Sequence, residues 1–114
     1  MKKVESIVRT AKLEDIVKAV EELDISGMSM SPIAGYGKQK GQDLIDSDIY
    51  EGNEIKFKEK LKIEIVVEDE KVDSLLDVLS EAARTDKIGD GKIFVYTVDQ
   101  VLRIRTGEIN NEAI

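Results

Sequence analysis

Residues 61–97 read LKIEIVVEDEKVDSLLDVLSEAARTDKIGDGKIFVYT and predict one complete β-α-β unit. The apolar residues at 61–67 begin by alternating with polar ones, which is typical of a strand. Residues 71–84 carry one apolar helix face, formed by Val72, Leu75, Leu76, Leu79, Ala82 and Ala83. Gly89, Asp90 and Gly91 predict a turn, and the β-branched and aromatic residues at 92–97 predict a second strand.

The N-terminal part repeats this order. A strand is predicted at 2–9, a helix at 12–24 and an extended segment at 28–36. The helix has an apolar stripe made of Leu13, Ile16, Val17, Val20 and Leu23. Pro32 has no backbone N–H to donate, which predicts that the segment at 28–36 is an edge strand or is bulged. After the second unit we expect a short strand at 101–105 and a flexible tail at 107–114.

Residues 37–60 fit neither the helical nor the strand period, and a loop of this length inside a compact domain is typically functional. The chain of 114 residues is expected to form one domain, 1–114. The predicted fold class is α+β, with a ferredoxin-like β-α-β-β-α-β order and the long loop between the second and third strands. We expect both helices on one sheet face. The opposite face is predicted to favour self-association through Ile63, Ile65, Val67, Ile93 and Val95.

Composition excludes several classes of site. The chain has no cysteine and no histidine, so thiolate chemistry, His bases and His metal ligands are absent, and any metal needs oxygen ligands such as those of Mg²⁺ or Ca²⁺. The net charge of −7 argues against a nucleic-acid binder. No apolar run approaches the roughly 20 residues of a membrane span, and the N-terminus lacks a signal-peptide pattern.

Three elements suit an anion. Residues 35–41 combine three glycines with two lysines, residues 87–92 place Gly89 and Gly91 before Lys92, and Arg103 and Arg105 would share one face of a strand. Each has a plainer explanation, respectively a solvated loop, an ordinary turn and two surface salt bridges. Their coincidence in one small acidic domain favours a polyphosphate site.

The sequence also resembles the PII signalling proteins over nearly its whole length. The resemblance lies in residues 1–9, in Gly37-Lys38-Gln39-Lys40-Gly41, in the strand at 62–67, in Ala83-Arg84-Thr85 with the run at 87–95, in residues 103–108 and in Ala113-Ile114. It implies a cytoplasmic ferredoxin-like homotrimer that binds ATP or ADP between subunits. It implies no enzymatic activity, no nucleic acid and no insertion into a membrane.

The resemblance also implies roles for particular residues. Those expected to contact the nucleotide are Ser29, Gly35, Gly37, Lys38, Gln39, Lys40, Val66, Gly89, Asp90, Gly91, Lys92, Arg103 and Arg105. The two arginines would come from the neighbouring subunit. Gln39 would hold Mg²⁺ together with the ATP phosphates, and Gln39, Lys60 and Arg9 would bind 2-oxoglutarate.

The long loop is expected to contact the regulated protein, but its tip departs from the family pattern. The tip reads Tyr50, Glu51, Gly52, Asn53, Glu54 and Ile55. Ile55 replaces the tyrosine that relatives modify covalently, and Glu51 reverses a basic charge. We therefore expect no covalent switching at the usual positions and a changed partner. Lys38 replaces a frequent arginine, and Asp86 replaces a common glycine.

Three hypotheses follow for the function. The first is a regulator of an ammonium transporter or a nitrogen-assimilation enzyme that responds to ATP, ADP and 2-oxoglutarate and reaches a membrane only through a transporter partner. The second is an ATP/ADP energy sensor without a 2-oxoglutarate response, which serves another transporter or enzyme. The third, a slow ATPase, is disfavoured because no general base or nucleophile constellation is present.

Overall fold

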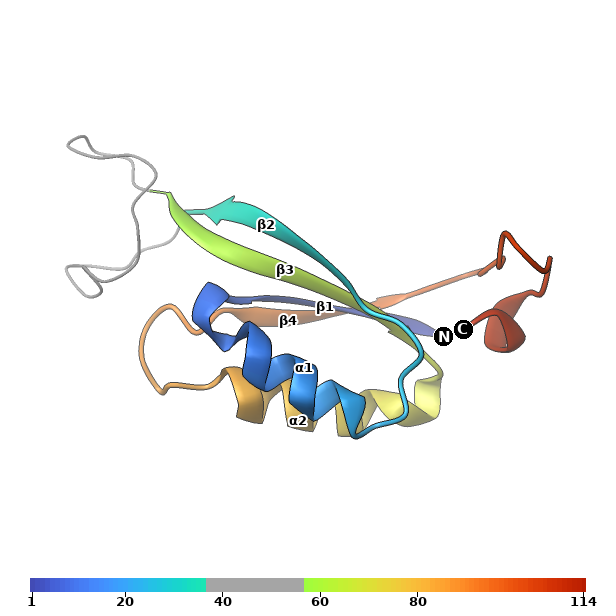
Figure 1. Ribbon diagram of the computed structural model, residues 1–114, viewed down its shortest axis with the longest axis horizontal. Coiled ribbons are helices and arrows are strands. Elements are labelled where there is room, and N and C mark those ends of the chain that lie inside the picture. Colours follow the sequence, from blue (N-terminus) through green and yellow to red (C-terminus); the bar gives the residue numbers. More distant parts are fainter. Residues whose placement is uncertain (37–56) are drawn as a thin grey trace.

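The computed structural model describes residues 1–36 and 57–114 (Figure 1). The elements along the chain are β1 (Lys2–Arg9), η1 (Thr10–Lys12), α1 (Leu13–Glu21), β2 (Ser29–Gly35), β3 (Lys58–Val67), η2 (Asp69–Lys71), α2 (Val72–Ala83), β4 (Lys92–Thr97) and η3 (Asn110–Ala113). The strands form one antiparallel sheet in the order β2-β3-β1-β4. Both helices cover the same face of this sheet (Figure 1). The predicted α+β, ferredoxin-like arrangement is confirmed.

Strand β2 is an edge strand, as Pro32 predicted. Pro32 lies opposite Leu61 of β3, the only strand that pairs with β2 among the described residues. An edge strand has one unpaired side, and this is the position in a sheet where proline is tolerated.

The core lies between the helices and the sheet. Ile16 and Val20 of α1 and Leu75, Leu79 and Ala83 of α2 are buried against it. The apolar stripes predicted for both helices therefore face inward, and burial of each large aliphatic side chain contributes about 1.5–3 kcal/mol.

The predicted faces of the sheet were wrong. Ile63 and Ile65 are fully buried beneath the helices, and Val67 is buried with them. The pairing places Ile63 and Ile93 opposite Ser6, and directly opposed residues share a face. All five residues assigned to the open face, including Val95, therefore belong to the helix side. Alternation divides a strand into two faces but does not say which face the helices cover.

Aromatic and charged residues occupy the open face instead. Lys3 forms ion pairs with Glu64 at 3.3 Å and with Glu5 at 3.9 Å, and its ammonium lies 4.9 Å from the centre of the Tyr96 ring. Phe94 lies on the same face and is exposed. Self-association through this face would therefore use a mixed polar and aromatic surface.

The strand predicted at 101–105 is absent. Only Leu102 makes a bridge, with Ile109, and the residues after it turn back through hydrogen bonds between Arg103 and Glu108 and between Gly107 and Arg103. We call residues 99–110 the C-terminal arm. It extends beyond the end of the sheet (Figure 1). Among the described residues no neighbouring strand completes its hydrogen bonds, so the local turn is preferred.

Two boundaries also differ from the prediction. Strand β3 begins at Lys58, so the three residues before 61 belong to the sheet and not to the long loop. Residues 110–113 form the short helix η3. No helix within residues 1–36 and 57–114 combines the length and the apolar character that crossing a bilayer requires.

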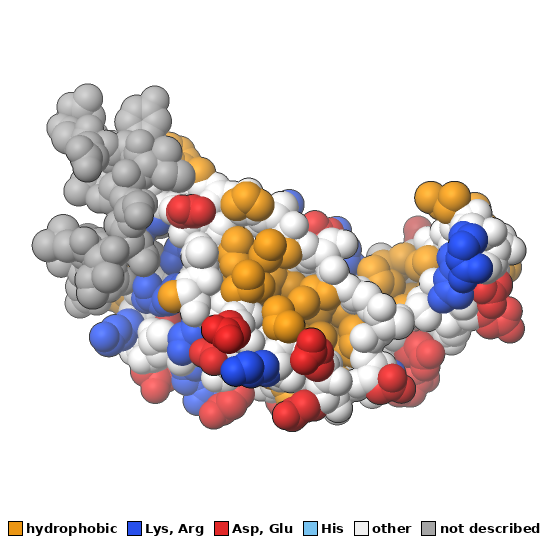
Figure 2. All heavy atoms as spheres, viewed as in Figure 1, with side chains coloured by type: hydrophobic (Ala, Val, Ile, Leu, Met, Phe, Trp, Pro, Cys, Tyr) orange, Lys and Arg blue, Asp and Glu red, His pale blue; other side chains and the backbone are white. Residues whose placement is uncertain are grey.

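Hydrophobic side chains also gather on the surface between β2 and α1 (Figure 2). Met30 of β2 is exposed there, while Leu23, Ile25 and Met28 from the α1–β2 link are partly buried against the core. The helices cover the centre of the sheet and leave this part of the edge strand uncovered.

Candidate functional site

The turn between α2 and β4 is built around two glycines with positive φ. Gly89 has φ 106° and Gly91 has φ 95°, a region that side-chain-bearing residues rarely adopt. A Cβ on Gly91 would lie 1.7 Å from the carbonyl oxygen of Ile7, so the backbone of the turn packs against β1 with no room for a side chain. Within the described residues, the N–H groups of Gly89 and Gly91 donate no hydrogen bond, while Asp90 closes the turn formed at residues 88–89. Such a group of free N–H donors is suited to an anion.

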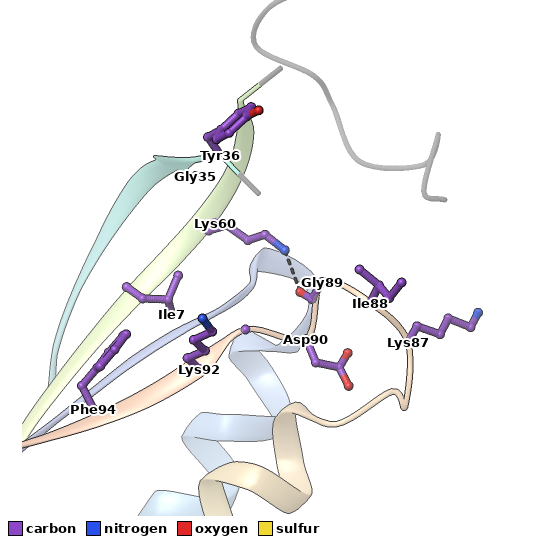
Figure 3. Close-up of a pocket in the computed structure, with 11 residues that line it drawn as sticks. Ile7, Gly35, Tyr36, Lys60, Lys87, Ile88, Gly89, Asp90, Lys92 and Phe94 are labelled. Atoms are coloured by element: carbon purple, nitrogen blue, oxygen red, sulfur yellow. Dashed lines mark hydrogen bonds between the residues drawn. The ribbon is translucent and has the colours of Figure 1, made fainter. Parts of the chain in front are cut away.

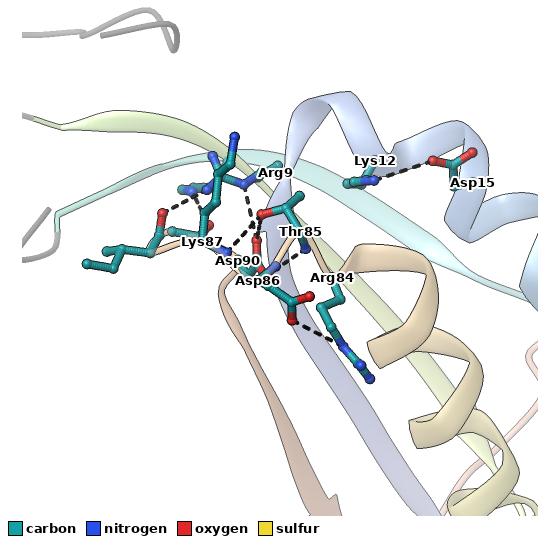
Figure 4. Close-up of polar contacts among 11 residues, drawn as sticks. Arg9, Lys12, Asp15, Arg84, Thr85, Asp86, Lys87 and Asp90 are labelled. Atoms are coloured by element: carbon teal, nitrogen blue, oxygen red, sulfur yellow. Dashed lines mark hydrogen bonds and ion pairs between the residues drawn. The ribbon is translucent and has the colours of Figure 1, made fainter. Parts of the chain in front are cut away.

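The carboxylate of Asp90 is directed into its own turn (Figure 4). Its Oδ2 accepts hydrogen bonds from the N–H groups of Thr85 at 2.8 Å and Asp86 at 2.9 Å. Its Oδ1 accepts from the Thr85 hydroxyl and from Arg9 Nε at 3.4 Å. Burial opposes the charge, but these donors outweigh it and lower the pKa of Asp90 from 3.8 to about 2.

Two cations from the sheet hold consecutive carbonyls of the same turn. Arg9 Nη2 donates to the Ile88 carbonyl at 2.8 Å, and Lys60 Nζ donates to the Gly89 carbonyl at 2.7 Å. Arg9 ends β1, and Lys60 is a buried residue of β3. Both residues were predicted as ligands of 2-oxoglutarate, and both contact the glycine turn in this structure.

A cavity of about 530 Å³ opens beside this turn (Figure 3). It brings together six of the predicted ligand residues, Gly35, Lys60, Gly89, Asp90, Gly91 and Lys92. Ile7, Tyr36 and Phe94 add apolar walls that the sequence analysis did not assign to the site. Tyr36 packs at a tilt against Phe57, with ring centres 5.9 Å apart. We call this cavity the glycine-loop pocket.

A second cavity, of about 560 Å³, contains another part of the predicted set. Ser29, Val66 and Arg103 line it, together with Lys3, Met28 and Glu64, which the sequence analysis did not assign. Arg103 Nη1 lies 3.0 Å from Glu108 Oε1, so the carboxylate holds the guanidinium at the edge of this cavity. We call it the arginine pocket.

The two pockets lie at opposite ends of the sheet. Gly35 of the glycine-loop pocket pairs with Lys58, while Ser29 of the arginine pocket pairs with Glu64. Gly35 lies six positions along the extended strand from Ser29, which corresponds to about 20 Å. One protomer therefore cannot close both pockets on the same nucleotide.

The remaining predicted residues are not brought into either pocket. Arg105 is exposed on the C-terminal arm and lines neither cavity. The strand that would have aligned it with Arg103 is absent. Gly37, Lys38, Gln39 and Lys40 lie outside the described residues, as do the loop-tip residues 50–55. In the described ranges no cluster of three or more acidic side chains could hold a metal ion.

Comparison with known proteins identifies the family. The sequence model described as nitrogen regulatory protein P-II matches residues 1–108. The chain belongs to the P-II family. Proteins of the P-II family are signal-transduction regulators that act through partner proteins.

Several relatives match this P-II chain over its full length. The nitrogen regulatory protein P-II of Microchaete diplosiphon is 51% identical, and the nitrogen regulatory protein P-II 1 of Escherichia coli K12 is 46% identical, each over 100% of both chains. A solved structure of Arabidopsis thaliana PII bound to citrate is 37% identical, with a TM-score of 0.80, and covers 99% of this chain and 91% of that one. These matches confirm the predicted PII resemblance.

The P-II signatures found in the sequence include most residues of both pockets. They did not include Thr85 as a partner of Asp90, nor the contacts of Arg9 and Lys60 with the turn. A polar residue five positions before Asp90 was visible in the sequence, but its contact depends on how the turn closes. The partners of Arg9 and Lys60 depend on strand register.

Proposed function

We propose that this P-II protein is a homotrimer that binds ATP or ADP between its subunits and passes that state to a partner protein. The glycine-loop pocket of one protomer would hold the phosphates. The arginine pocket of the next protomer would hold the base and ribose near Ser29 and Val66 and reach the phosphates with Arg103. The partner protein would bind through the long loop that precedes β3, residues 37–57.

The division of the predicted ligand residues carries this proposal. Each pocket contains only part of the set, and about 20 Å of strand separates the two parts within one chain. A cyclic assembly places the front of one protomer against the back of the next and so forms the same composite site at every interface.

The C-terminal arm supports the assembly independently. Leu102 is 60% exposed, Ile104 is 97% exposed and Ile109 is 49% exposed. Aliphatic side chains of this size gain about 1.5–3 kcal/mol each on full burial. A neighbouring protomer would cover these side chains where the arm extends beyond its own sheet.

The effector is proposed to be 2-oxoglutarate, bound with Mg-ATP near Gln39, Lys60 and Arg9. The related Arabidopsis protein was solved with citrate, which is also a small polycarboxylate. The alternative of an ATP/ADP sensor without 2-oxoglutarate has its own support, because Arg9 and Lys60 already donate to carbonyls of the glycine turn. Calorimetry with ATP, Mg²⁺ and 2-oxoglutarate distinguishes the two, since reciprocal coupling requires that 2-oxoglutarate tighten ATP binding.

The partner is proposed to be an ammonium transporter or a nitrogen-assimilation enzyme, with another transporter or enzyme as the alternative. Glu51 stands in place of a basic residue, which favours a different partner. Ile55 stands in place of the modified tyrosine, which favours control by bound ligands without covalent modification. We place the protein in the cytoplasm, recruited to the membrane only by a transporter partner, and assign it no catalytic role.

Subunit complementation tests the proposal. Lys92→Ala weakens the glycine-loop half of the site, and Arg103→Ala weakens the other half. Each variant alone should bind ATP at least about tenfold more weakly, as expected for a lost charge-assisted contact. Every mixed trimer has one interface at which both halves are intact.

Co-expressed, differently tagged variants allow mixed trimers to be purified. Calorimetry should then show about one site of wild-type affinity per mixed trimer. Mixed trimers that bind no better than the parent variants would contradict the shared site. A wild-type chain that is monomeric in light scattering, or that ignores adenine nucleotides, would contradict the proposal as a whole.

A further inference from the structure

We propose that Arg9, Lys60, Thr85 and Asp90 form a loop clamp that sets the glycine turn for phosphate before any ligand arrives. In this clamp Asp90 is a positioning residue and does not contact the phosphates. The inference rests on the proposed nucleotide function and assigns roles within that same site.

The orientation of Asp90 carries the first step. Both carboxylate oxygens are occupied by four donors, two from the backbone of Thr85 and Asp86 and two from the side chains of Thr85 and Arg9. In Figure 3 the carboxylate points away from Tyr36, Lys60 and Phe94, which line the cavity. A carboxylate turned toward the cavity would repel phosphate, and the clamp prevents this.

The second step concerns the peptide groups of the turn. A peptide is planar, so its N–H points opposite to its carbonyl. Arg9 holds the carbonyl of the peptide between Ile88 and Gly89, and Lys60 holds that of the next peptide. These two contacts therefore also set the directions of the N–H groups of Gly89 and Asp90, and the Gly89 N–H has no partner of its own among the described residues.

The third step is energetic. Ordering a free residue costs about 1–2 kcal/mol of backbone entropy. A turn that is already ordered avoids this cost when the ligand binds, so the gain appears as affinity. Arg9 comes from β1, Lys60 from β3 and Thr85 from the segment that follows α2, so three separate parts of the fold hold one turn.

Thr85→Val tests the clamp because valine keeps the shape of threonine and removes the hydroxyl that donates to Asp90. Thr85→Ser keeps the hydroxyl and serves as the conservative rescue. Ser80→Ala is the matched control, since it removes a hydroxyl of the preceding helix α2 that donates to the Asp77 carbonyl. All three are compared with the wild-type trimer for unfolding, amide hydrogen exchange and the affinities for ATP, ADP and AMP.

Thr85→Val should speed amide exchange across residues 86–91 in the free protein and weaken ATP and ADP binding about tenfold. AMP has only one phosphate, so its affinity should fall much less in Thr85→Val. Thr85→Ser and Ser80→Ala should behave as wild type. Equal losses for all three nucleotides, or wild-type exchange and affinity in Thr85→Val, would overturn the clamp.

The exchange measurement needs no ligand, which separates the two proposals. If the wild type binds no nucleotide but Thr85→Val still loosens residues 86–91, the clamp holds and the proposed function fails. If the wild type binds ATP and Thr85→Val binds it equally well, the clamp fails and the proposed function holds.

Discussion

Gly91 and Ile7 approach so closely that a Cβ on the glycine would lie 1.7 Å from the carbonyl oxygen of the isoleucine. The neighbour is backbone in the central part of the sheet, so it cannot move aside as a flexible side chain would. Gly91 also has φ 95°, which disfavours any side chain. We expect Gly91→Ala to destabilise the protein by more than about 3 kcal/mol, measured by chemical unfolding.

Gly107→Ala is the control for the backbone angle alone. Gly107 has φ 75°, but an added Cβ would meet nothing within 4 Å. The expected cost is therefore only the left-handed penalty of about 1–2 kcal/mol. Equal costs for the two substitutions would show that the contact with Ile7 is relieved by movement of the turn.

Asp90 should make stability depend on pH in an acidic window. Its folded-state pKa of about 2 lies below the ordinary value of 3.8, so its contribution is complete above pH 4 and is lost as the pH falls toward 2. Because solvent screens this partly exposed carboxylate, its contribution is at most about 2 kcal/mol. Urea unfolding from pH 5 to pH 2 at fixed protein concentration measures it.

Asp90→Asn is the comparison for this titration. The variant should be less stable at pH 5 and should lose less stability than the wild type between pH 4 and pH 2. Parallel curves for the two proteins over that range would assign the acid sensitivity to other carboxylates.

Ser6 should be a site at which a smaller side chain stabilises the fold. It is fully buried in β1, and its hydroxyl has no hydrogen-bond partner in the described part of the chain. An unsatisfied hydroxyl in a core costs about 1–3 kcal/mol. We expect Ser6→Ala to raise the free energy of unfolding by about 1 kcal/mol, since the small cavity it leaves offsets part of that gain.

Ser80→Ala is a suitable reference, because the Ser80 hydroxyl is exposed and satisfied by the Asp77 carbonyl. Its effect should stay within about 0.5 kcal/mol. A loss of stability in Ser6→Ala would indicate that a buried water pairs with the serine.

Ile104 should be required for assembly. Its side chain is 97% exposed on the C-terminal arm, so a charged residue at this position should not disturb the packing within the protomer. In the proposed trimer it would be buried, and Ile104→Asp would place an unpaired charge in the interface. Light scattering should show dissociation at concentrations where the wild type stays trimeric.

Asn111→Asp adds the same charge to η3 at an exposed position and should leave the oligomeric state unchanged. A trimer of normal stability in Ile104→Asp would mean that the arm does not contribute to the interface through this residue.

The order of elements was predictable because each relies on local patterns. The helical stripes and the alternation at 61–67 set helix and strand, and Pro32 placed β2 at the edge. The side of the sheet that the helices cover was not predictable. Ile63 and Phe94 are both apolar strand residues, and only the pairing of the strands shows that Ile63 faces the helices and Phe94 the open side. The residues at 101–105 have a strand-like pattern, but none of the strands that the structure describes lies beside them.

The site was predictable in composition more than in geometry. Gly89, Gly91 and Lys92 were recognisable from the sequence as a candidate anion-binding turn, and they line one pocket together. The contact of Asp90 with Thr85, and those of Arg9 and Lys60 with neighbouring carbonyls, depend on side-chain directions that no local pattern encodes. Arg103 and Arg105 were expected to act as a pair, but the turn of the arm separates them.

The distance between the two pockets also bears on how such a sensor responds to its own abundance. If each binding site exists only where two chains meet, a bound nucleotide stabilises the interface between them as well as acting as a signal. Dilution would then lower occupancy even when the cellular supply of nucleotide is constant. Saturating nucleotide would in turn protect the assembly from falling apart, so the number of chains present becomes an input of its own.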